Sequence, residues 1–296
     1  REGARAQSGL HSRLHPSRSG FAMSLRPCRL LPAVFLSVLA ACAQAAPALA
    51  EALQGTAVVL MGEVHYNADG HRERLALLTA AVEAGWRPAI AMEQFDRESQ
   101  PALTMAQQRC GQDADCVIAA ARTDNGGWDW RYYRPVVALA QRYQLPLLAA
   151  NVSRADAARV ARAGFPAALD AASIARHRLT QALPADLAAG QGEAVRDGHC
   201  RLLPDSAVPG MVNAQVARDV FMADVLDGQS GRGVVLLAGN GHVRRDLGVP
   251  RWLSGDRPPL VIGFVEQDPP EAAFDHLLRL APVSRPDPCA ALAAPR

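Results

Sequence analysis

Five short runs of the chain are continuously hydrophobic and do not alternate between apolar and polar positions. They are TAVVLM at 56–61, PAIAM at 88–92, LPLLAA at 145–150, GVVLLAG at 233–239 and PLVIGFV at 259–265. This pattern is typical of strands that are covered on both faces, as in a parallel sheet. The five runs therefore predict a mostly parallel central sheet.

Segments between these runs repeat apolar residues at the spacing of a helix. The clearest are residues 71–85, residues 133–144, which carry Pro135 near their start, and residues 211–228. A proline in the first turn is compatible with a helix. Strands that alternate with helices predict an α/β fold with the sheet flanked by helices. Residues 152–210 have no strong strand pattern and are expected to form a helical insertion on the same core.

The beginning of the chain has the pattern of an export signal. Residues 1–22 are basic and patternless, and they are expected to lie upstream of a start at Met23. Residues 23–42 join arginines to an apolar run and small residues, as bacterial secretory signals do. Their end, LAAC, matches a lipobox, so Cys42 is predicted to carry a lipid anchor in the periplasm, at the outer membrane. The alternative is cleavage after AQA, which would give a soluble periplasmic protein.

The remaining chain is divided into a tether at 43–54, an α/β domain at 55–284 and a tail at 285–296. All 31 basic residues are arginine, which excludes a lysine Schiff base. Residues 1–41 hold six arginines and one glutamate, so the rest has 25 basic and 28 acidic residues and a net charge near −3. This balance gives no basic patch for a nucleic acid, and none is expected as a partner.

Four cysteines follow Cys42, namely Cys110, Cys116, Cys200 and Cys289. An even number in an exported chain indicates two disulfides. Pairing of the first two would close a short loop, and pairing of the last two would tie the tail to the body. Three pairings are possible, and the sequence does not choose among them. A metal site is the rival interpretation, but the CxxC spacing is absent.

Titratable and polar side chains follow the predicted strands at their carboxyl ends. Glu63 and His65 follow the first strand, Glu93 the second, Asn151 the third and His242 the fourth. Ligands of open α/β sheets bind outside the carboxyl ends of the strands. If the strands are parallel neighbours, these side chains converge on one edge of the sheet. Each of them alone is also compatible with a structural role, as a partner for backbone groups.

Two glutamates and two histidines at one edge allow two kinds of chemistry. Carboxylates and neutral imidazoles can hold a divalent metal ion, and they can act as general acids and bases without one. The spacing of His65 and His71 is not that of the HExxH zinc proteases. His199 lies beside Cys200 in a proline-rich loop, where a disulfide would hold it in place.

The segment NGGWDWRYYRP at 125–135 concentrates the aromatic residues of an aromatic-poor chain, with Trp128, Trp130, Tyr132 and Tyr133. One interpretation is packing of a loop and a helix start on the core. The other is a flat apolar surface for a planar ligand, with a tyrosine oxygen that can reach a metal. Haem iron accepts tyrosinate as a protein ligand, and haem pockets are mostly apolar.

Five stretches occur together in one order: VVLMGEVHYNADGHRERLALL, AIAMEQFDRESQPAL, WDWRYYRPVVALAQRYQLPLLAANVSR, PGMVNAQVARDVFMA and VVLLAGNGHVRRDLGVPRWL. As a set they resemble the ChaN-type haem-binding lipoproteins, which belong to a superfamily with the Tiki/TraB and erythromycin-esterase-like proteins. The resemblance covers about residues 55–265. GExH and GNGH are shared across the superfamily, whereas the WDW…Y.P and PGM…AQ…RD..MA stretches are more specific to the ChaN-type branch.

The resemblance implies an α/β fold that binds haem at a homodimer interface, with a tyrosine on the iron and a histidine and a lysine of the partner chain near the propionates. Tyr133 is favoured as the iron ligand because it occupies the Y.P motif position, and Tyr66 is its rival. The histidines expected to contact haem are His65, His71, His199 and His242. An arginine has to replace the lysine in this chain.

The expected function is therefore that of an exported, lipid-anchored haem-binding protein that serves haem or iron uptake and is not an enzyme. In the enzymatic branches of the superfamily, the residues that match Glu63, His65, Glu93 and His242 are associated with hydrolysis. A hydrolase that uses this edge, with or without a divalent metal, is the alternative. A scaffold that keeps the edge only as structure is the third hypothesis.

Overall fold

The structure is a computed structural model that describes residues 48–123, 127–229, 231–255, 258–270, 272–285, 287 and 289–290. The chain divides into two units, Arg1–Cys42 and Ala43–Arg296, and the described residues all belong to the second. The predictions for the export signal and Cys42 lie outside the described residues. Within the described residues, no helix combines the length and the hydrophobicity that crossing a membrane requires.

A six-stranded parallel sheet with the strand order β3-β2-β4-β1-β5-β6 forms the centre of the unit. Its strands are β1 (Val58–Met61), β2 (Ala89–Asp96), β3 (Leu147–Asn151), β4 (Val234–Leu237), β5 (Leu260–Val265) and β6 (His276–Arg279). The first five confirm the strands predicted from apolar runs. The prediction missed β6 because its four residues HLLR are half-buried or exposed at the sheet edge, so it has no continuous apolar run.

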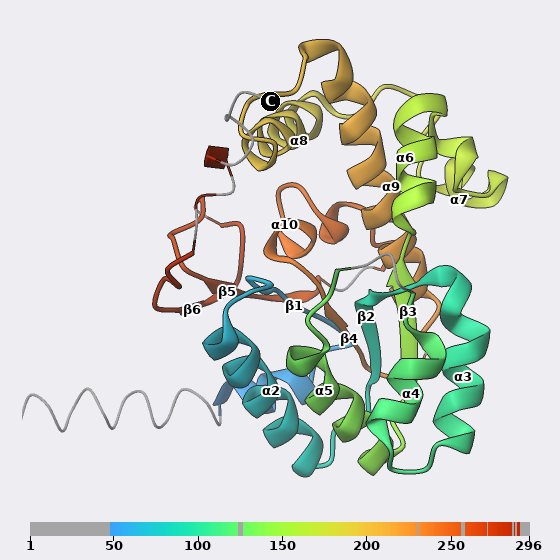
Figure 1. Ribbon diagram of the computed structural model, residues 1–296, viewed down its shortest axis with the longest axis vertical. Coiled ribbons are helices and arrows are strands. Elements are labelled where there is room, and N and C mark those ends of the chain that lie inside the picture. The colour runs from blue at the N-terminus through green and yellow to red at the C-terminus, as the bar shows by residue number, and fades with distance from the viewer. Residues whose placement is uncertain are drawn as a thin grey trace, which may run out of the picture. The chain divides into compact units, whose positions relative to one another are not determined.

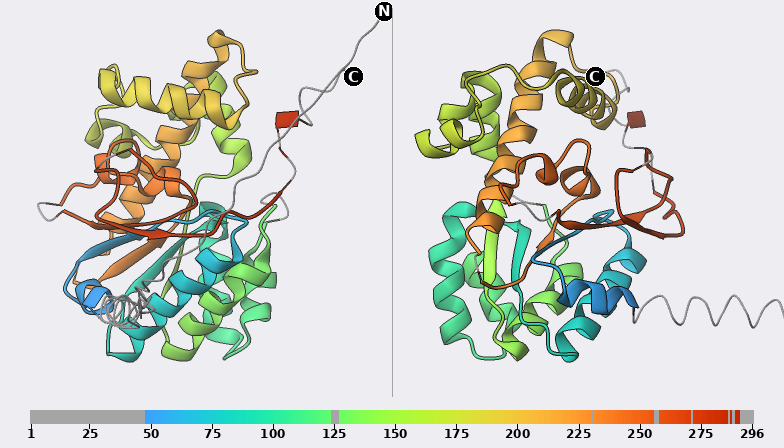
Figure 2. Two further views of the ribbon diagram at one scale, coloured as in Figure 1. Left: turned by 90° about the vertical axis from the view of Figure 1, so that its left-hand side faces the viewer. Right: turned by 180° about the vertical axis from the view of Figure 1, so that it is seen from behind.

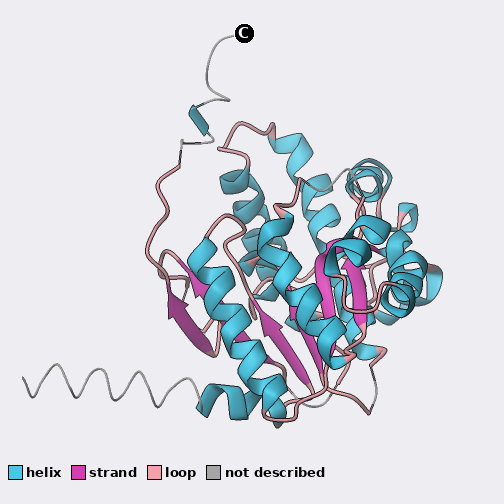
Figure 3. Ribbon diagram, turned by 60° about the horizontal axis from the view of Figure 1, so that its bottom comes forward, coloured by secondary structure: helices cyan, strands magenta, loops and turns pink. Residues whose placement is uncertain are grey.

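Helices cover both faces of this sheet, as Figure 1 and the turned views of Figures 2 and 3 show. The first face packs against α2 (Ala68–Glu83), α3 (Gln100–Arg109), α4 (Ala114–Ala121) and α5 (Trp130–Tyr143). The second packs against α6 (Arg154–Ala163), α8 (Ala185–Gly198), α9 (Val208–Asp227) and α10 (Asn240–Val243). Alternate strand residues point to the two cores: Val59 and Met61 to the first, Leu60 to the second.

The helical insertion predicted at 152–210 is confirmed. It contains α6, α7 (Ala171–Arg176), α8 and the first turn of α9, with short 3₁₀ turns at Phe165–Ala167 and Asp205–Ala207. Two further 3₁₀ turns lie at Arg97–Ser99 and Val249–Arg251. The α/β class, the parallel sheet and the insertion thus agree with the sequence pattern.

Two helix boundaries differ from the prediction. Residues 48–54 were expected to be part of a tether, but they are helical, and Leu53 is fully buried in the first core. Helix α2 begins at Ala68, three residues before the predicted start. The side chain of Asn67 caps it by accepting a hydrogen bond from the Gly70 backbone N–H at 2.9 Å. The polar segment after β1 is therefore a short turn that leads directly into a helix.

Two disulfides join Cys110 to Cys116 and Cys200 to Cys289. The first links the end of α3 to α4, and the second ties the C-terminal tail to the residues that follow α8. The sequence predicted two disulfides, and the structure selects this pairing among the three possible ones.

Candidate functional site

The carboxyl ends of β1, β2 and β4 bring the candidate residues together. The register pairs Met61 with Leu237 and Met92 with Leu237, so these three residues lie at one level of the sheet. Glu93 lies one residue beyond that level, and Glu63 and Gly239 lie two residues beyond it. The predicted convergence follows from this register, because parallel strands present their carboxyl ends at one edge.

Glu63 is a buried carboxylate with a full set of partners. Its Oε1 accepts hydrogen bonds from the Tyr133 hydroxyl and from His65 Nδ1, both at 2.6 Å, and its Oε2 pairs with the Arg74 guanidinium. Burial by itself would raise the pKa of Glu63, but Arg74 and the bond from His65 outweigh it and hold that pKa well below its usual range. Glu63 is therefore ionised and fixes the surrounding side chains.

His71 lies in the first turn of α2 and joins the Glu63 cluster to the backbone. Its Nε2 donates to the His65 carbonyl at 3.0 Å, and its Nδ1 accepts from Arg74 at 3.1 Å. Its ring stacks on Tyr132 with centroids 4.5 Å apart. Burial and the nearby Arg74 lower the pKa of His71, so the ring is neutral at pH 7. These contacts give His71 a structural role beneath the site.

Glu93 and His242 form a second buried cluster. Glu93 Oε2 accepts from the Gly239 backbone N–H at 2.8 Å, and its Oε1 lies 3.6 Å from His242 Nε2. On the other side of the ring, His242 Nδ1 bonds to Asp219 Oδ1 at 2.5 Å. Burial raises the pKa of Asp219 to about 6, against the pull of His242. Burial also opposes charge on His242, but Asp219 and Glu93 raise its pKa. The imidazole is thus held between two carboxylates.

His65 lies between the two clusters and is 46% exposed at its side chain. Burial alone would lower the pKa of His65, but the Glu63 bond and the charge of Glu93 raise it. A Cβ at Gly239 would lie 3.0 Å from His65 Nε2 and 3.7 Å from Glu93 Oε2. A glycine is therefore needed for the ring to pack this closely on the β4 turn.

An aromatic hollow of about 430 Å³ opens beside His65. It is lined by His65, Tyr66, Gly127, Trp128, Asp129, Tyr132 and Tyr133. The His65 and Trp128 rings meet edge to face at 5.0 Å. The hollow combines flat aromatic walls with an imidazole and phenol oxygens. The aromatic residues of the 125–135 segment also pack on the first core, so the segment has features of both interpretations. Residues 130–135 themselves belong to α5, and residues 125 and 126 lie outside the described residues.

Tyr133, favoured above as an iron ligand, is 1% exposed, and its hydroxyl donates to the ionised Glu63. Burial and the charge of Glu63 raise the pKa of Tyr133 far above its usual range. A phenolate at this position would face a carboxylate at hydrogen-bond distance. The location therefore argues against Tyr133 as a ligand of a metal in the hollow.

Tyr66 lines the aromatic hollow and a second hollow of about 430 Å³ on its other side. Its hydroxyl donates to Glu266 Oε2 at 3.3 Å, and the Arg285 guanidinium carbon lies 3.7 Å from its ring centroid. The second hollow is also lined by Asn240 and Arg244. Tyr66 is half-buried at the boundary of the two hollows, so a ligand there can reach its phenol. Tyr132 is also half-buried in the aromatic hollow, but its ring stacks on His71.

Two predicted residues are not part of these clusters. His199 Nδ1 bonds to the Val195 carbonyl at 2.8 Å at the end of α8, and among the described residues it shares no hydrogen bond or ring contact with Glu63 or Glu93. Asn151 accepts from Arg218 at 2.9 Å. The position of His199 is explained by the end of its own helix, and that of Asn151 by a contact between β3 and α9.

The structure adds two residues that the sequence analysis missed, Arg74 and Asp219. Each lies in a helix, and each is 1% exposed. The signal was present in the sequence, since both charges fall on the otherwise apolar face of a predicted helix. Within the described residues, no group of three or more His, Cys, Asp or Glu is arranged to hold a metal ion, so a divalent metal at this edge is not supported.

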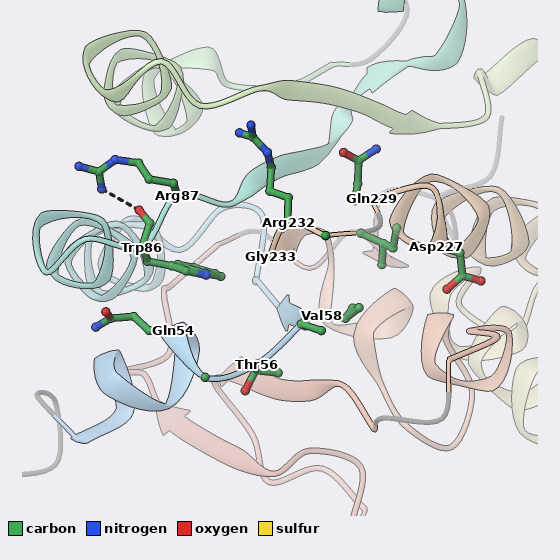
Figure 4. Close-up of a pocket in the computed structure, with 13 residues that line it drawn as sticks. Gln54, Thr56, Val58, Trp86, Arg87, Asp227, Gln229, Arg232 and Gly233 are labelled. Atoms are coloured by element: carbon green, nitrogen blue, oxygen red, sulfur yellow. Dashed lines mark hydrogen bonds between the residues drawn. The ribbon is translucent and has the colours of Figure 1, made fainter.

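A larger hollow, of about 750 Å³, lies at the opposite, amino edge of the sheet (Figure 4). Its walls include Trp86, Arg87, Asp227 and Arg232. Arg87 donates to the carbonyl of Val82 in the last turn of α2 and to the carbonyl of Trp86 just beyond this helix. The charged groups here therefore bind carbonyls at the end of a helix or lie on the surface. The clusters at the carboxyl edge, in contrast, are buried.

A family model described as haem-binding uptake, Tiki superfamily, ChaN matches residues 49–253. Among solved structures, ChaN of Campylobacter jejuni, described with cofacial haem binding, is 19% identical over 77% of this chain and 89% of its own, with a TM-score of 0.64. At this identity the likeness shows the fold alone.

Two more distant structures are a toxin effector domain, RRSP, of Vibrio vulnificus and the erythromycin esterase EreC. Each is 15% identical over 72% of this chain, with a TM-score of 0.40; they are covered over 35% and 70% of their own lengths. TM-scores this low support no conclusion about this chain. No curated protein matches the sequence.

Proposed function

We propose, from the premise that the chain belongs to the family described as haem-binding uptake, Tiki superfamily, ChaN, that it binds haem in the aromatic hollow beside Tyr66. The observation that carries the proposal is the lining of this hollow, where Trp128 and Tyr132 offer ring surfaces and Tyr66 offers a phenol oxygen. Ligand sites of this kind are mostly apolar, with few polar anchors.

The residues present suit haem. Its iron accepts tyrosine oxygen and histidine nitrogen as axial ligands, and the hollow contains both atom types. A bound haem would supply an iron centre that takes a protein ligand. The chain would supply that ligand, the aromatic walls and nearby positive charge, for which Arg244 stands in the adjoining hollow where the resemblance has a lysine.

Tyr66 is proposed as the iron ligand in place of Tyr133. The Tyr66 hydroxyl has one long hydrogen bond, 3.3 Å to Glu266, whereas the Tyr133 hydroxyl is held by Glu63 at 2.6 Å. Burial and the Glu266 carboxylate raise the pKa of Tyr66 as well, and Glu266 would take up the phenol proton if iron were bound there. His65 is the other donor in the hollow, but Glu63 and the Gly239 backbone hold its ring.

The wider role that we propose is haem or iron uptake at the cell envelope, with the chain exported and anchored through a lipid on Cys42. Two disulfides support an oxidising compartment, because disulfides rarely persist in the cytosol. A homodimer is proposed on the same family basis. Mass spectrometry of Cys42 in the native host would test the anchor, since cleavage elsewhere without lipid would contradict it.

A haem titration tests the binding proposal, with absorbance in the Soret region as the readout. Ferric haem should form a saturable complex with the wild type. Tyr66→Phe should weaken it by about tenfold or more, since a ligand bond to iron is lost and each tenfold step is about 1.4 kcal/mol. The matched variant Tyr133→Phe should keep the wild-type spectrum. No saturable complex would overturn the proposal, and a loss of the spectrum in Tyr133→Phe alone would return the ligand to Tyr133.

A second candidate function is hydrolysis by the Glu93 cluster. The specific observation is the sequence of contacts from Asp219 through His242 to Glu93, in which an imidazole is held by one carboxylate and faces another. General acid–base catalysis uses such pairs. Hydrolysis of ester and peptide substrates that is lost in Glu93→Gln and Asp219→Asn, while haem binding stays unchanged, would support it. Equal turnover in wild type and variants would exclude it.

A further inference from the structure

The segment 281–285, which we name the strap, follows β6 and places Arg285 over the Tyr66 ring. Its Ala281 carbonyl accepts from Asn67 Nδ2 at 3.1 Å, and its Val283 backbone N–H donates to Glu266 Oε1 at 3.3 Å. The strap therefore contacts the turn between β1 and α2, which carries Tyr66.

One carboxylate joins the strap to Tyr66. Glu266 accepts from the Tyr66 hydroxyl at 3.3 Å, from Asn67 Nδ2 at 2.7 Å and from the Val283 N–H. Arg285 lies over the Tyr66 ring at 3.7 Å, within the range of a cation–π interaction. The phenol is thus held at its oxygen by Glu266 and at its face by the strap.

Both ends of the strap are fixed. On the N-terminal side, β6 pairs with β5, and the Leu280 N–H donates to the Val265 carbonyl at 2.8 Å. On the C-terminal side, Cys289 is four residues beyond Arg285 and is joined to Cys200 after α8. A segment tied at both ends has fewer conformations to lose when it packs, so its contacts persist at a lower cost in entropy.

We infer that the strap is a positioning element for Tyr66, and that the Cys200–Cys289 disulfide holds Arg285 and Val283 in place on the Tyr66–Glu266 pair. This rests on the proposed function, in which Tyr66 contacts the bound haem. Arg285 acts through Tyr66 and not on the ligand. The state of one disulfide thereby sets how firmly the phenol is held, and with it the affinity of the hollow.

Reduction is the step that would release the strap. A dithiol reductant gives two electrons and two protons, the bond between the two sulfurs breaks, and both cysteines become thiols while the dithiol closes to its own disulfide. The strap then keeps its β6 end alone. The second disulfide, Cys110–Cys116, joins α3 to α4 and offers a matched control, since it shares no contact with Tyr66 among the described residues.

The test compares wild type with Cys200→Ser/Cys289→Ser, Cys110→Ser/Cys116→Ser, Arg285→Ala and Arg285→Lys in two measurements. The first needs no ligand: backbone NMR order parameters of Val283 and residue 285. We expect rigid values of about 0.85 in wild type and in the Cys110/Cys116 variant, and values below about 0.6 without the Cys200–Cys289 bond. The second is the affinity for ferric haem.

Haem affinity should fall about fivefold in the Cys200/Cys289 variant and in Arg285→Ala, as the loss of one partly exposed cation–π contact predicts. Arg285→Lys should stay within about twofold of wild type, since the cation is kept, and the Cys110/Cys116 variant should equal wild type. Unchanged order parameters in the Cys200/Cys289 variant would overturn the inference whatever the protein binds. So would unchanged affinity in Arg285→Ala. A wild type that binds no haem would overturn the proposed function and the effect on affinity, even if the strap loosens as expected.

Discussion

Glu63 and Glu93 are two buried glutamates at the same edge of one sheet, and their surroundings differ. Glu63 has an arginine, a tyrosine hydroxyl and a histidine within hydrogen-bond distance. Among the described residues, Glu93 has one close partner, the Gly239 N–H at 2.8 Å, and faces His242 at 3.6 Å. The first carboxylate has its charge compensated, while the second keeps an oxygen that has no close donor within the described part of the chain.

The difference between the two carboxylates distinguishes residues that stabilise this edge from residues that can contact a ligand. A buried charge with a complete set of partners is costly to disturb and offers nothing to a ligand. A buried carboxylate with a loosely placed oxygen is where ligand or substrate chemistry can occur. Arg74 and Tyr133, which are buried against Glu63, thus belong to the scaffold. The half-exposed ring of His65 and the half-buried Tyr66 and Tyr132 line the hollow and can meet a ligand.

Removal of the Glu63 charge should have the largest effect. Glu63→Gln should lower the free energy of unfolding by about 3–5 kcal/mol, because Arg74 would remain buried without its counter-ion. Urea unfolding followed by circular dichroism would measure it. Glu73→Gln is the control. Glu73 is half-exposed on helix α2, next to Arg74, and its substitution should change stability by less than about 0.5 kcal/mol. A similar small loss at both positions would contradict the structural role of Glu63.

Tyr133→Phe should cause the next largest loss of stability. The substitution removes a buried hydroxyl that donates to an ionised carboxylate, and hydrogen bonds to charged groups contribute about 1.5–3 kcal/mol. Thermal unfolding should show this loss. A stability equal to wild type would mean that the Tyr133 hydroxyl is not needed by the scaffold and would reopen its role as a ligand.

The charge of Glu63 also predicts a dependence on pH. Its folded-state pKa is lowered from the ordinary 4.5, so its contribution to stability is present above that pH and is lost as the pH falls below it. The stability difference between wild type and Glu63→Gln should shrink by about 1.4 kcal/mol per pH unit below pH 4. Unfolding of both proteins between pH 3 and 6 would measure it. A constant difference across this range would show that the carboxylate is not ionised in the fold.

The smallest effect is expected at the turn after β4. Gly239→Ala places a Cβ 3.0 Å from His65 Nε2, so the ring must shift, at a cost of about 1 kcal/mol. Gly241→Ala, where nothing lies within 4 Å of the added carbon, is the matched control and should not disturb His65. The chemical shifts of the His65 ring should move in the first variant alone. Equal shifts in both would mean that the ring does not pack on Gly239.

Much of the fold follows from the sequence because continuous apolar runs have few alternatives to buried parallel strands. The ends of the predicted strands are enough to predict that Glu63, Glu93 and His242 lie together. The edge strand β6 was missed because HLLR is too short and too exposed to give a pattern. The helix at 48–54 was missed because its few apolar residues follow a segment that resembles a linker.

The partners of the site residues could not be predicted in the same way. Arg74 and Asp219 reach Glu63 and His242 from helices whose rotation depends on how they pack on the sheet. The iron ligand proposed here is Tyr66 and not Tyr133 because the phenol of Tyr133 is buried. The position of a tyrosine in a sequence motif does not show whether its side chain is buried. Long-range contacts of this kind arise from tertiary packing, which local pattern leaves open.

The most direct test of the haem proposal is an exchange of the proposed ligand atom. Electron paramagnetic resonance and absorbance spectra would be recorded for the ferric haem complexes of wild type and Tyr66→His. We expect an oxygen-ligated high-spin spectrum for the wild type and a change to an imidazole-ligated spectrum in the variant, because both side chains are accepted by haem iron. Identical spectra of the two complexes would show that Tyr66 does not bind the iron.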